Sequence, residues 1–280
     1  MDSVLKQKLD DIARTLRYHI IEMVAGESSK GGHLGGSNSA ADIVTALYFH
    51  KMKLNPKNPQ DEDRDRFILS KGHAALVQYA ALAELGYFSK KELFNVKAIG
   101  SMLQGHPDLN KTPGIEANTG SLGMGLSIGL GMALGMRMDN NSRKVYVMIG
   151  DGELAEGQIW EAVIAAAHHK AENLIAIIDY NKVQAMGPTA DRMEINNLCE
   201  RFSSFGWHTI QIDGHNMAEI CEALDTADTL SGKPVAIVAD TIKGKGVFFA
   251  EGNAAFHNAV GMTNEQYEMA KNDISSYTCK

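Results

Sequence analysis

The chain of 280 residues carries a formal net charge of −7, and charged residues make up 22% of it. This length can bury a large core, while the acidic balance argues against nucleic acid as a main partner, because phosphate binding needs clustered Lys and Arg. Cys199, Cys221 and Cys279 have no metal-like spacing and cannot all pair, which favours a reducing compartment. The N-terminus does not resemble a signal peptide, and the most apolar stretch, 122–136, is too short to span a bilayer. We therefore expect a cytoplasmic protein that makes no contact with a membrane.

The first half of the chain is predicted to be mainly helical. Apolar residues recur at helical spacing over 9–23, and a polar, glycine-rich segment follows, in which Ser37 or Ser39 is expected to cap the next helix. The segment 65–70 is typical of a short buried strand, and a helix is expected to begin near His73.

The second half alternates more regularly between strand and helix patterns. Strands are predicted at 144–149, 174–179, 207–212 and 234–240, with helices at 156–169, 192–204 and 216–230. This rhythm predicts a parallel sheet with helices on both faces. No repeat, low-complexity tract or linker interrupts the chain, so residues 1–280 are predicted to form a single α/β domain.

Polar residues follow two of these strands at the point where each strand ends. Gly150, Asp151 and Gly152 follow the first, and Asn181, which follows the next, lies 30 residues after Asp151. If the strands are neighbours, both side chains lie at the same edge of the sheet and can share an ion. With the main-chain carbonyl of Val183 they form an oxygen set that suits Mg²⁺, and the glycines let the backbone approach phosphates. The alternative is two tight turns, the first of them with a helix cap.

Four of the ten histidines lie in segments with no helical pattern, most of them beside glycine. They are His33, His73, His106 and His257. An imidazole can donate to a phosphate oxygen or move a proton near neutral pH, so these four are candidate functional residues. The adjacent His168 and His169 lie on a predicted helix with no patterned partner and are expected to have no such role.

The string from Gly150 to Gln184 resembles the thiamine diphosphate motif of transketolases. The resemblance implies the thiamine diphosphate-binding fold, in the form of a PP-type domain. It also implies that Asp151, Asn181 and the Val183 carbonyl hold Mg²⁺, or Ca²⁺ or Mn²⁺, which clamps the cofactor's diphosphate, with Gly152 beside it. Glu156 corresponds to an acid of the cofactor site that supports the cofactor-binding residues without binding the metal and that contacts another subunit. It lies at the start of a predicted helix, where the helix dipole favours a carboxylate.

The same resemblance assigns roles to the four histidines. His33, in GHLGG, matches a histidine that contacts substrate, and His106, in GHP, matches one that contacts the C1 hydroxyl of the donor ketose. His73 and His257 match a pair near the cofactor's diphosphate, and His257 also faces the substrate. Asn258 follows His257 where the family more often has glycine.

Two further segments are similar to parts of the family. Gly120 and Leu122, in TGSLGMG, match positions whose backbone touches the cofactor's aminopyrimidine ring. Lys243 and Lys245, in TIKGKGV, are candidates to approach phosphates, although exposure to solvent is expected for at least one of them. Glu153 receives no role from the resemblance and is expected to be solvated.

The resemblance covers nearly the whole chain, but only the diphosphate-binding part of a transketolase. It implies a separate C-terminal subunit that carries the pyrimidine-binding domain and the catalytic glutamate, in an α2β2 heterotetramer, with a homodimer of this chain possible by itself. The implied reaction transfers a two-carbon ketol unit from a ketose phosphate to an aldose phosphate, with thiamine diphosphate and a divalent metal.

The sequence leaves two other interpretations open. The chain could belong to another thiamine diphosphate enzyme, as the α chain of a 2-oxoacid dehydrogenase or as a deoxyxylulose-phosphate-type synthase. It could also be a non-catalytic protein that holds thiamine diphosphate and Mg²⁺ or caps a partner. The sequence does not identify the sugar phosphates.

Overall fold

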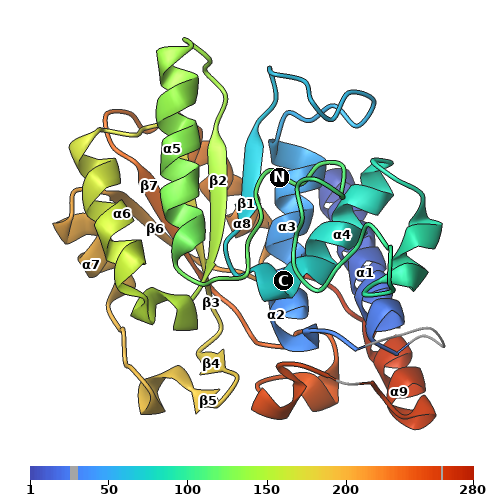
Figure 1. The fold of residues 1–280 in the computed structure, drawn as a ribbon. Coiled ribbons are helices and arrows are strands. Elements are labelled where there is room, and N and C mark those ends of the chain that lie inside the picture. The colour runs from blue at the N-terminus through green and yellow to red at the C-terminus, as the bar shows by residue number, and fades with distance from the viewer. Residues whose placement is uncertain (26–30, 260) are drawn as a thin grey trace.

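A central parallel sheet organises the computed structural model, which describes residues 1–25, 31–259 and 261–280 (Figure 1). Within these residues the sheet has five strands in the order β1-β2-β3-β7-β6. The strands are β1 (Arg66–Leu69), β2 (Val145–Gly150), β3 (Leu174–Tyr180), β6 (His208–Asp213) and β7 (Val235–Asp240). Every neighbouring pair is parallel, so all five carboxyl ends lie at one edge of the sheet.

The central strands are apolar along nearly their whole length. β2 and β3 are buried from end to end except for Tyr180, while the edge strand β6 is mostly half-buried. Continuous burial is expected of parallel strands that are covered on both faces, because side chains pointing either way meet a helix.

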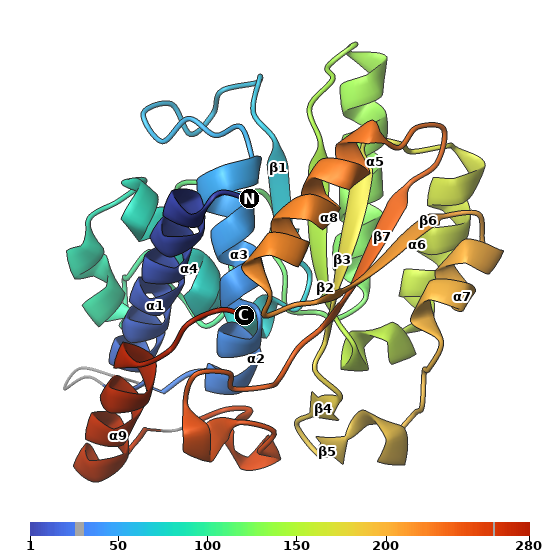
Figure 2. The same ribbon diagram turned by 180° about the vertical axis from the view of Figure 1, so that it is seen from behind.

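Helices cover both faces of the sheet, as Figures 1 and 2 show from opposite sides. One face packs against α5 (Met124–Met138), α6 (Gly157–His168) and α7 (Leu198–Ser204). The other face packs against the layer formed by α1 (Ser3–Ala25), α2 (Leu34–Ser39), α3 (Ala41–Ala46), α4 (Ala75–Leu85), α8 (Met217–Thr229) and α9 (Asn264–Ser275). The predicted parallel sheet between two helical layers is confirmed.

Short elements complete the described structure. These are a π-helical turn η1 (Leu47–Lys51), the 3₁₀ turns η2 (Gly72–Ala74), η3 (Lys90–Asn95), η4 (Gly152–Ala155), η5 (Thr189–Asp191), η6 (Phe248–Ala250) and η7 (Ala254–Phe256), and a hairpin of β4 (Val183–Gln184) and β5 (Gly187–Pro188). η2 follows β1 and η4 follows β2, so both lie at the carboxyl edge of the sheet.

Two predictions of local structure were wrong. The helix expected over 192–204 begins only at Leu198, because Asn197 has a left-handed backbone (φ 53°) that a right-handed helix cannot continue through. Ser37 and Ser39 cap no helix, since both lie inside α2. The Ser37 hydroxyl donates instead to the carbonyl of His33 (2.7 Å).

No helix in the described ranges combines the length and the hydropathy needed to cross a bilayer.

Candidate functional site

The tips of β2 and β3 lie side by side and carry the two predicted metal-binding side chains. Gly150 pairs with Asp179 in register, and the amide of Asp151 donates to the carbonyl of Asp179 (3.3 Å). Asp151 and Asn181 are both buried, with exposed fractions of 8% and 7%. The geometry on which the metal prediction depends is therefore present.

The carboxylate of Asp151 is buried without a positive partner. It accepts hydrogen bonds from the amides of Gly152 (2.7 Å) and Lys182, and it forms no ion pair among the described residues. Burial and the nearby charge of Asp179 raise the pKa of Asp151 to about 6. A buried charge normally requires a counter-ion, so this carboxylate suits a cation.

The other two candidate ligands lie beside it. The side-chain oxygen of Asn181 accepts from the amide of Val183 (3.2 Å), and its amide nitrogen donates to Asp179 (3.1 Å), which fixes its orientation. The Val183 carbonyl accepts from the ammonium of Lys243 (2.7 Å). Lys243 is therefore in the site, and the expectation that it approaches phosphates is compatible with its place.

The four candidate histidines meet next to these strand tips. The ring of His33 lies 5.1 Å from that of His73, 5.3 Å from that of His257 and 6.3 Å from that of His106, measured between centroids. Burial and then the charge of Lys243 lower the pKa of His257 to about 4. For His33, burial comes first and the charge of Lys97 second, and its pKa is also about 4. Both rings are neutral at physiological pH, so each has one ring nitrogen that can accept and one that can donate.

Distant segments of the chain hold these histidines together. Gly32 and Ala259 exchange two backbone hydrogen bonds of 2.9 Å, which brings His33 and His257 into contact. The hydroxyl of Tyr79, on α4, donates to the carbonyl of His106 (2.9 Å).

A cavity of about 240 Å³ opens between the strand tips and the histidines. Its lining includes these predicted site residues: His33, His73, Gly120, Leu122, Asp151, Gly152, Asn181, Val183 and His257. His106 is not in the lining but packs against it, since a Cβ atom on Gly120 would lie 2.7 Å from its ring. Nearly all of the predicted site thus converges on one cavity.

Two acids near the cavity differ from expectation. Glu153 was expected to be solvated, which is wrong: it is 2% exposed and accepts from the Ser70 hydroxyl (2.5 Å) and from the amides of Gly123 (2.8 Å) and Gly150 (3.1 Å). Its role is to join β1, β2 and the loop before α5. Glu156 is exposed at the start of α6 and does not line the cavity.

Comparison with known proteins identifies the family. A sequence model described as "Transketolase, thiamine diphosphate binding domain" matches residues 8–274. The chain belongs to the transketolase family. It is 46% identical over 239 residues to the 6-deoxy-6-sulfo-D-fructose transketolase subunit SqwG of Clostridium sp. (strain MSTE9). The aligned residues cover 85% of this chain and 86% of that protein. It is 41% identical over 259 residues to an apulose-4-phosphate transketolase subunit of Phocaeicola vulgatus, covering 92% and 91%.

Full-length transketolases are similar to the chain over only part of their length. Mouse transketolase is 41% identical over 90% of this chain, which spans 40% of the mouse protein. The crystal structure of the Campylobacter jejuni transketolase superposes with a TM-score of 0.87 at 31% identity and covers all of this chain, which spans 44% of that one. The predicted transketolase family, fold and enzyme class are confirmed, which removes the two other thiamine diphosphate enzymes as alternatives.

Two residues of this transketolase site escaped the sequence analysis. Lys71 and Asp179 are both fully buried and form an ion pair, and Lys71 lines the cavity. Asp179 also accepts from the hydroxyls of Ser39 (2.7 Å) and Thr241 and from the amide of Asn181. Charged residues inside the otherwise apolar segments FILSKG and LIAIID were the signal that could have found them.

The residues present fit a diphosphate held through a divalent cation. One carboxylate, one amide oxygen and one carbonyl form a hard oxygen set, which suits such a cation when phosphates complete its coordination. Among the described residues no group of three or more His, Cys, Asp or Glu that could hold a metal is found, at this site or away from it. Nδ1 of His257 is buried and lacks a hydrogen-bond partner among the described residues, so it is available to a ligand in the cavity.

Proposed function

We propose that this chain is the diphosphate-binding subunit of a two-chain transketolase that moves a two-carbon ketol unit from a ketose phosphate to an aldose phosphate. The observation that carries the proposal is the unpaired, buried carboxylate of Asp151 beside Asn181, facing a group of neutral histidines. Asp151, Asn181 and the Val183 carbonyl would hold Mg²⁺, or Ca²⁺ or Mn²⁺, and the cation would bind the diphosphate of thiamine diphosphate. When bound, the cofactor supplies the nucleophilic carbon that accepts the ketol unit.

The chain's own groups would bind and orient the ligands of this site. Lys243 and His73 line the cavity and would neutralise the diphosphate or donate hydrogen bonds to it. His33, His106 and His257 would contact the sugar, because their neutral rings can exchange a proton with a hydroxyl group at neutral pH. Gly120 and Leu122 would meet the cofactor's ring through their backbone.

A partner chain is part of the proposal, since the relatives that match this chain over most of both lengths are named as subunits. The cavity of about 240 Å³ is smaller than a typical ligand pocket of roughly 300–1,000 Å³, which fits a cofactor only part of which lies on this chain. Met124 on α5 and Ile164 on α6 are 44% and 53% exposed and would contribute apolar area to an interface. Glu156 is exposed and lies against Gly123, the residue before Met124, and it would also belong to the interface.

The assembly we propose is an α2β2 heterotetramer in which the partner carries the pyrimidine-binding domain and the catalytic glutamate. Residues 1–280 would form one domain of it. A cytoplasmic location is proposed because Cys199, Cys221 and Cys279 are free thiols.

Reconstitution tests the proposal directly. The chain mixed with a transketolase subunit that carries a pyrimidine-binding domain, thiamine diphosphate and Mg²⁺ is expected to transfer ketol units between sugar phosphates, while neither chain does so alone. A coupled assay over a panel of ketose and aldose phosphates, including sulfosugar and apulose derivatives, measures the transfer. Cofactor binding without transfer on any sugar would instead favour the non-catalytic binding protein.

The contact between Gly120 and His106 gives a separate prediction. In Gly120→Ala the new Cβ would lie 2.7 Å from the His106 ring, on a backbone with φ of 143° that disfavours alanine. The His106 ring must move from its present position, and ketol transfer by the reconstituted enzyme is expected to fall about 100-fold. Gly131→Ala on α5 is the matched control, because no atom lies within 4 Å of its new Cβ and activity should be unchanged. Equal activities of the two variants would contradict the role of His106.

A further inference from the structure

A buried polar cluster lies outside the cavity and takes no part in the site described above. It consists of Arg17, Asp42, His215, Tyr277 and Cys279, and is called the Asp42 cluster below. The Asp42 carboxylate, fully buried in α3, binds the guanidinium of Arg17 at 2.7 and 2.8 Å. It also accepts from the Tyr277 hydroxyl (2.7 Å) and the Cys279 thiol (3.1 Å). Burial by itself would raise the pKa of Asp42, but Arg17 and His215 hold it well below its usual range, so the carboxylate is charged.

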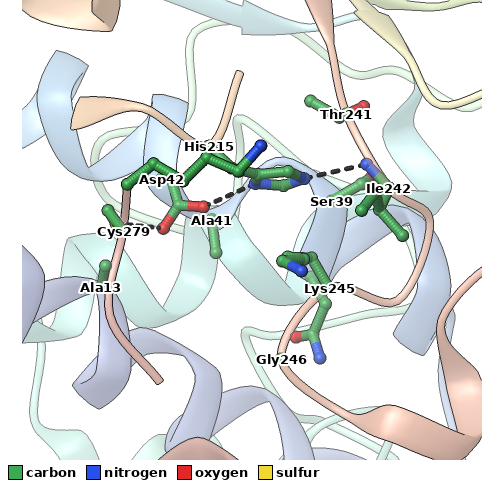
Figure 3. Close-up of polar contacts among 12 residues, drawn as sticks. Ala13, Ser39, Ala41, Asp42, His215, Thr241, Ile242, Lys245, Gly246 and Cys279 are labelled. Carbon is green, nitrogen blue, oxygen red and sulfur yellow. Dashed lines mark hydrogen bonds and ion pairs between the residues drawn. The ribbon is translucent and has the colours of Figure 1, made fainter. Parts of the chain in front are cut away.

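His215 connects this carboxylate to the segment that follows β7 (Figure 3). Its Nδ1 lies 2.8 Å from Asp42, and its Nε2 accepts from the backbone amide of Ile242 (2.8 Å). A backbone amide can only donate, so Nε2 carries no proton and the neutral ring donates from Nδ1 to Asp42. The charged carboxylate thus selects the tautomer that can hold the Ile242 amide.

The residues on either side of Ile242 enter the cofactor site. The hydroxyl of Thr241 donates to Asp179, and the ammonium of Lys243 donates to Val183. Lys243 is only 3% exposed. Burial and the charge of Lys71 lower its pKa to about 8, so a buried ammonium is unfavourable here unless the backbone holds it in place.

The Asp42 cluster also holds this segment on the far side of Lys243. Nε of Arg17 donates to the carbonyl of Lys245 (3.0 Å). Gly246 packs so closely on Arg17 that a Cβ there would lie 2.9 Å from the arginine side chain. Gly214, next to His215, has no room for a Cβ against Thr241 either, so the loop and the segment are in tight contact. The backbone around Lys243 is therefore held on both sides by His215 and Arg17, neither of which lines the cavity.

We propose that His215, oriented by Asp42, is a positioning residue that places Lys243 for the cofactor's diphosphate by holding the Ile242 amide. This inference rests on the proposed function, because the ligand of Lys243 is the diphosphate of that proposal. Loss of the hydrogen bond from Ile242 loosens the segment at the residue before Lys243, although the backbone bonds of Lys243 and Gly244 to Gly252 and Gly35 remain. The Lys243 ammonium then shifts from its place at the Val183 carbonyl.

Two substitutions of His215 separate positioning from simple structural support. The amide of asparagine reaches only the position of Nδ1, so His215→Asn can still donate to Asp42 but cannot accept from Ile242. The amide of glutamine reaches the position of Nε2, so His215→Gln keeps an acceptor for Ile242. Two quantities are measured on the full chain: hydrogen exchange of the Ile242 amide without ligand, and the Kd for thiamine diphosphate at saturating Mg²⁺.

His215→Asn is expected to exchange the Ile242 amide at least about tenfold faster and to raise the Kd about tenfold. In His215→Gln both quantities should stay within about threefold of the parent. His208→Asn, at the other end of β6, is the matched control and should change neither.

Several results would overturn the inference. Equal effects of the Asn and Gln variants, or an unchanged exchange rate in His215→Asn, would mean that the Ile242 bond does not hold the segment. Faster exchange with an unchanged Kd would mean that the segment does not position Lys243. Nitrogen NMR shifts of His215 in the parent chain give a check that needs no variant: a ring protonated on Nε2 contradicts the inference. Failure of the parent to bind thiamine diphosphate even with its partner subunit present would count against the proposed function instead, while the exchange rates would still decide whether His215 holds Ile242.

Discussion

Asp151→Ala is expected to abolish the Mg²⁺-dependent binding of thiamine diphosphate, with a Kd raised by more than about 100-fold. Asp151 is the only one of the three proposed ligands that brings a negative charge, since Asn181 and Val183 contribute neutral oxygens. Without it none of the proposed ligands supplies a counter-charge to the cation, and Lys243 is then the main positive contact of the diphosphate. Titration calorimetry with thiamine diphosphate, with and without Mg²⁺, measures the effect.

A charge-only variant separates this binding loss from unfolding. Because burial raises the pKa of Asp151 to about 6, above the unfolded value of 3.8, the folded chain binds a proton more tightly than the unfolded chain. Without metal, the charged form of Asp151 therefore lowers the free energy of unfolding above about pH 6. This penalty is lost as the pH falls from about 6 to 3.8, where Asp151 becomes protonated in the folded chain. In urea unfolding without metal, the free energy of unfolding of the parent relative to that of Asp151→Asn should increase as the pH is lowered from 7 to about 4.

His168→Ala is the control for both measurements, since His168 is exposed in the last turn of α6, away from the cavity. It should bind the cofactor like the parent. Equal loss of binding in Asp151→Ala and His168→Ala would mean that the cofactor does not bind at the tips of β2 and β3.

The second large effect is expected from Lys71→Met, which should lower the free energy of unfolding by about 3–5 kcal/mol. The substitution leaves the carboxylate of Asp179 buried with hydroxyl and amide donors but without its positive partner. Burial would raise the pKa of Asp179, and the charge and hydrogen bond of Lys71 outweigh it, lowering that pKa to about 2. Removing Lys71 makes the charged form of Asp179 unfavourable, so the loss should be larger at pH 7 than at pH 4.5.

Urea unfolding of single and double variants measures this coupling. Lys71→Met combined with Asp179→Asn is expected to be less destabilised than Lys71→Met alone, because no charge then remains buried. Lys53→Met removes the ion pair between Lys53 and Asp63, whose exposed fractions are 52% and 61% respectively. This substitution should lower the free energy of unfolding by less than about 1 kcal/mol. A loss in Lys71→Met no larger than in Lys53→Met would show that the buried pair does not stabilise the fold.

Much of the sheet and of the site could be predicted because both depend on short-range patterns. Continuous apolar runs predicted β2 and β3 within one residue at each end, since a parallel strand covered on both faces has little tolerance for polar residues. The chemistry at their tips followed from topology alone: neighbouring parallel strands end at one edge, so Asp151 and Asn181 had to be close once the strands were adjacent. Patterns that depend on a single backbone angle, such as the left-handed Asn197 ahead of α7, were missed.

The sequence by itself determined the family, the succession of most strands and helices along the chain, and the candidate ligands, because residue type and spacing carry that information locally. Only the tertiary structure decided which charges compensate one another. Lys71 and Asp179 lie 108 residues apart, and Asp42 and His215 lie 173 apart. Whether a buried charge is paired depends on which distant side chain reaches it, and no local pattern encodes that distance. The same reason explains Glu153, whose three donors come from separate segments that meet only in the folded chain.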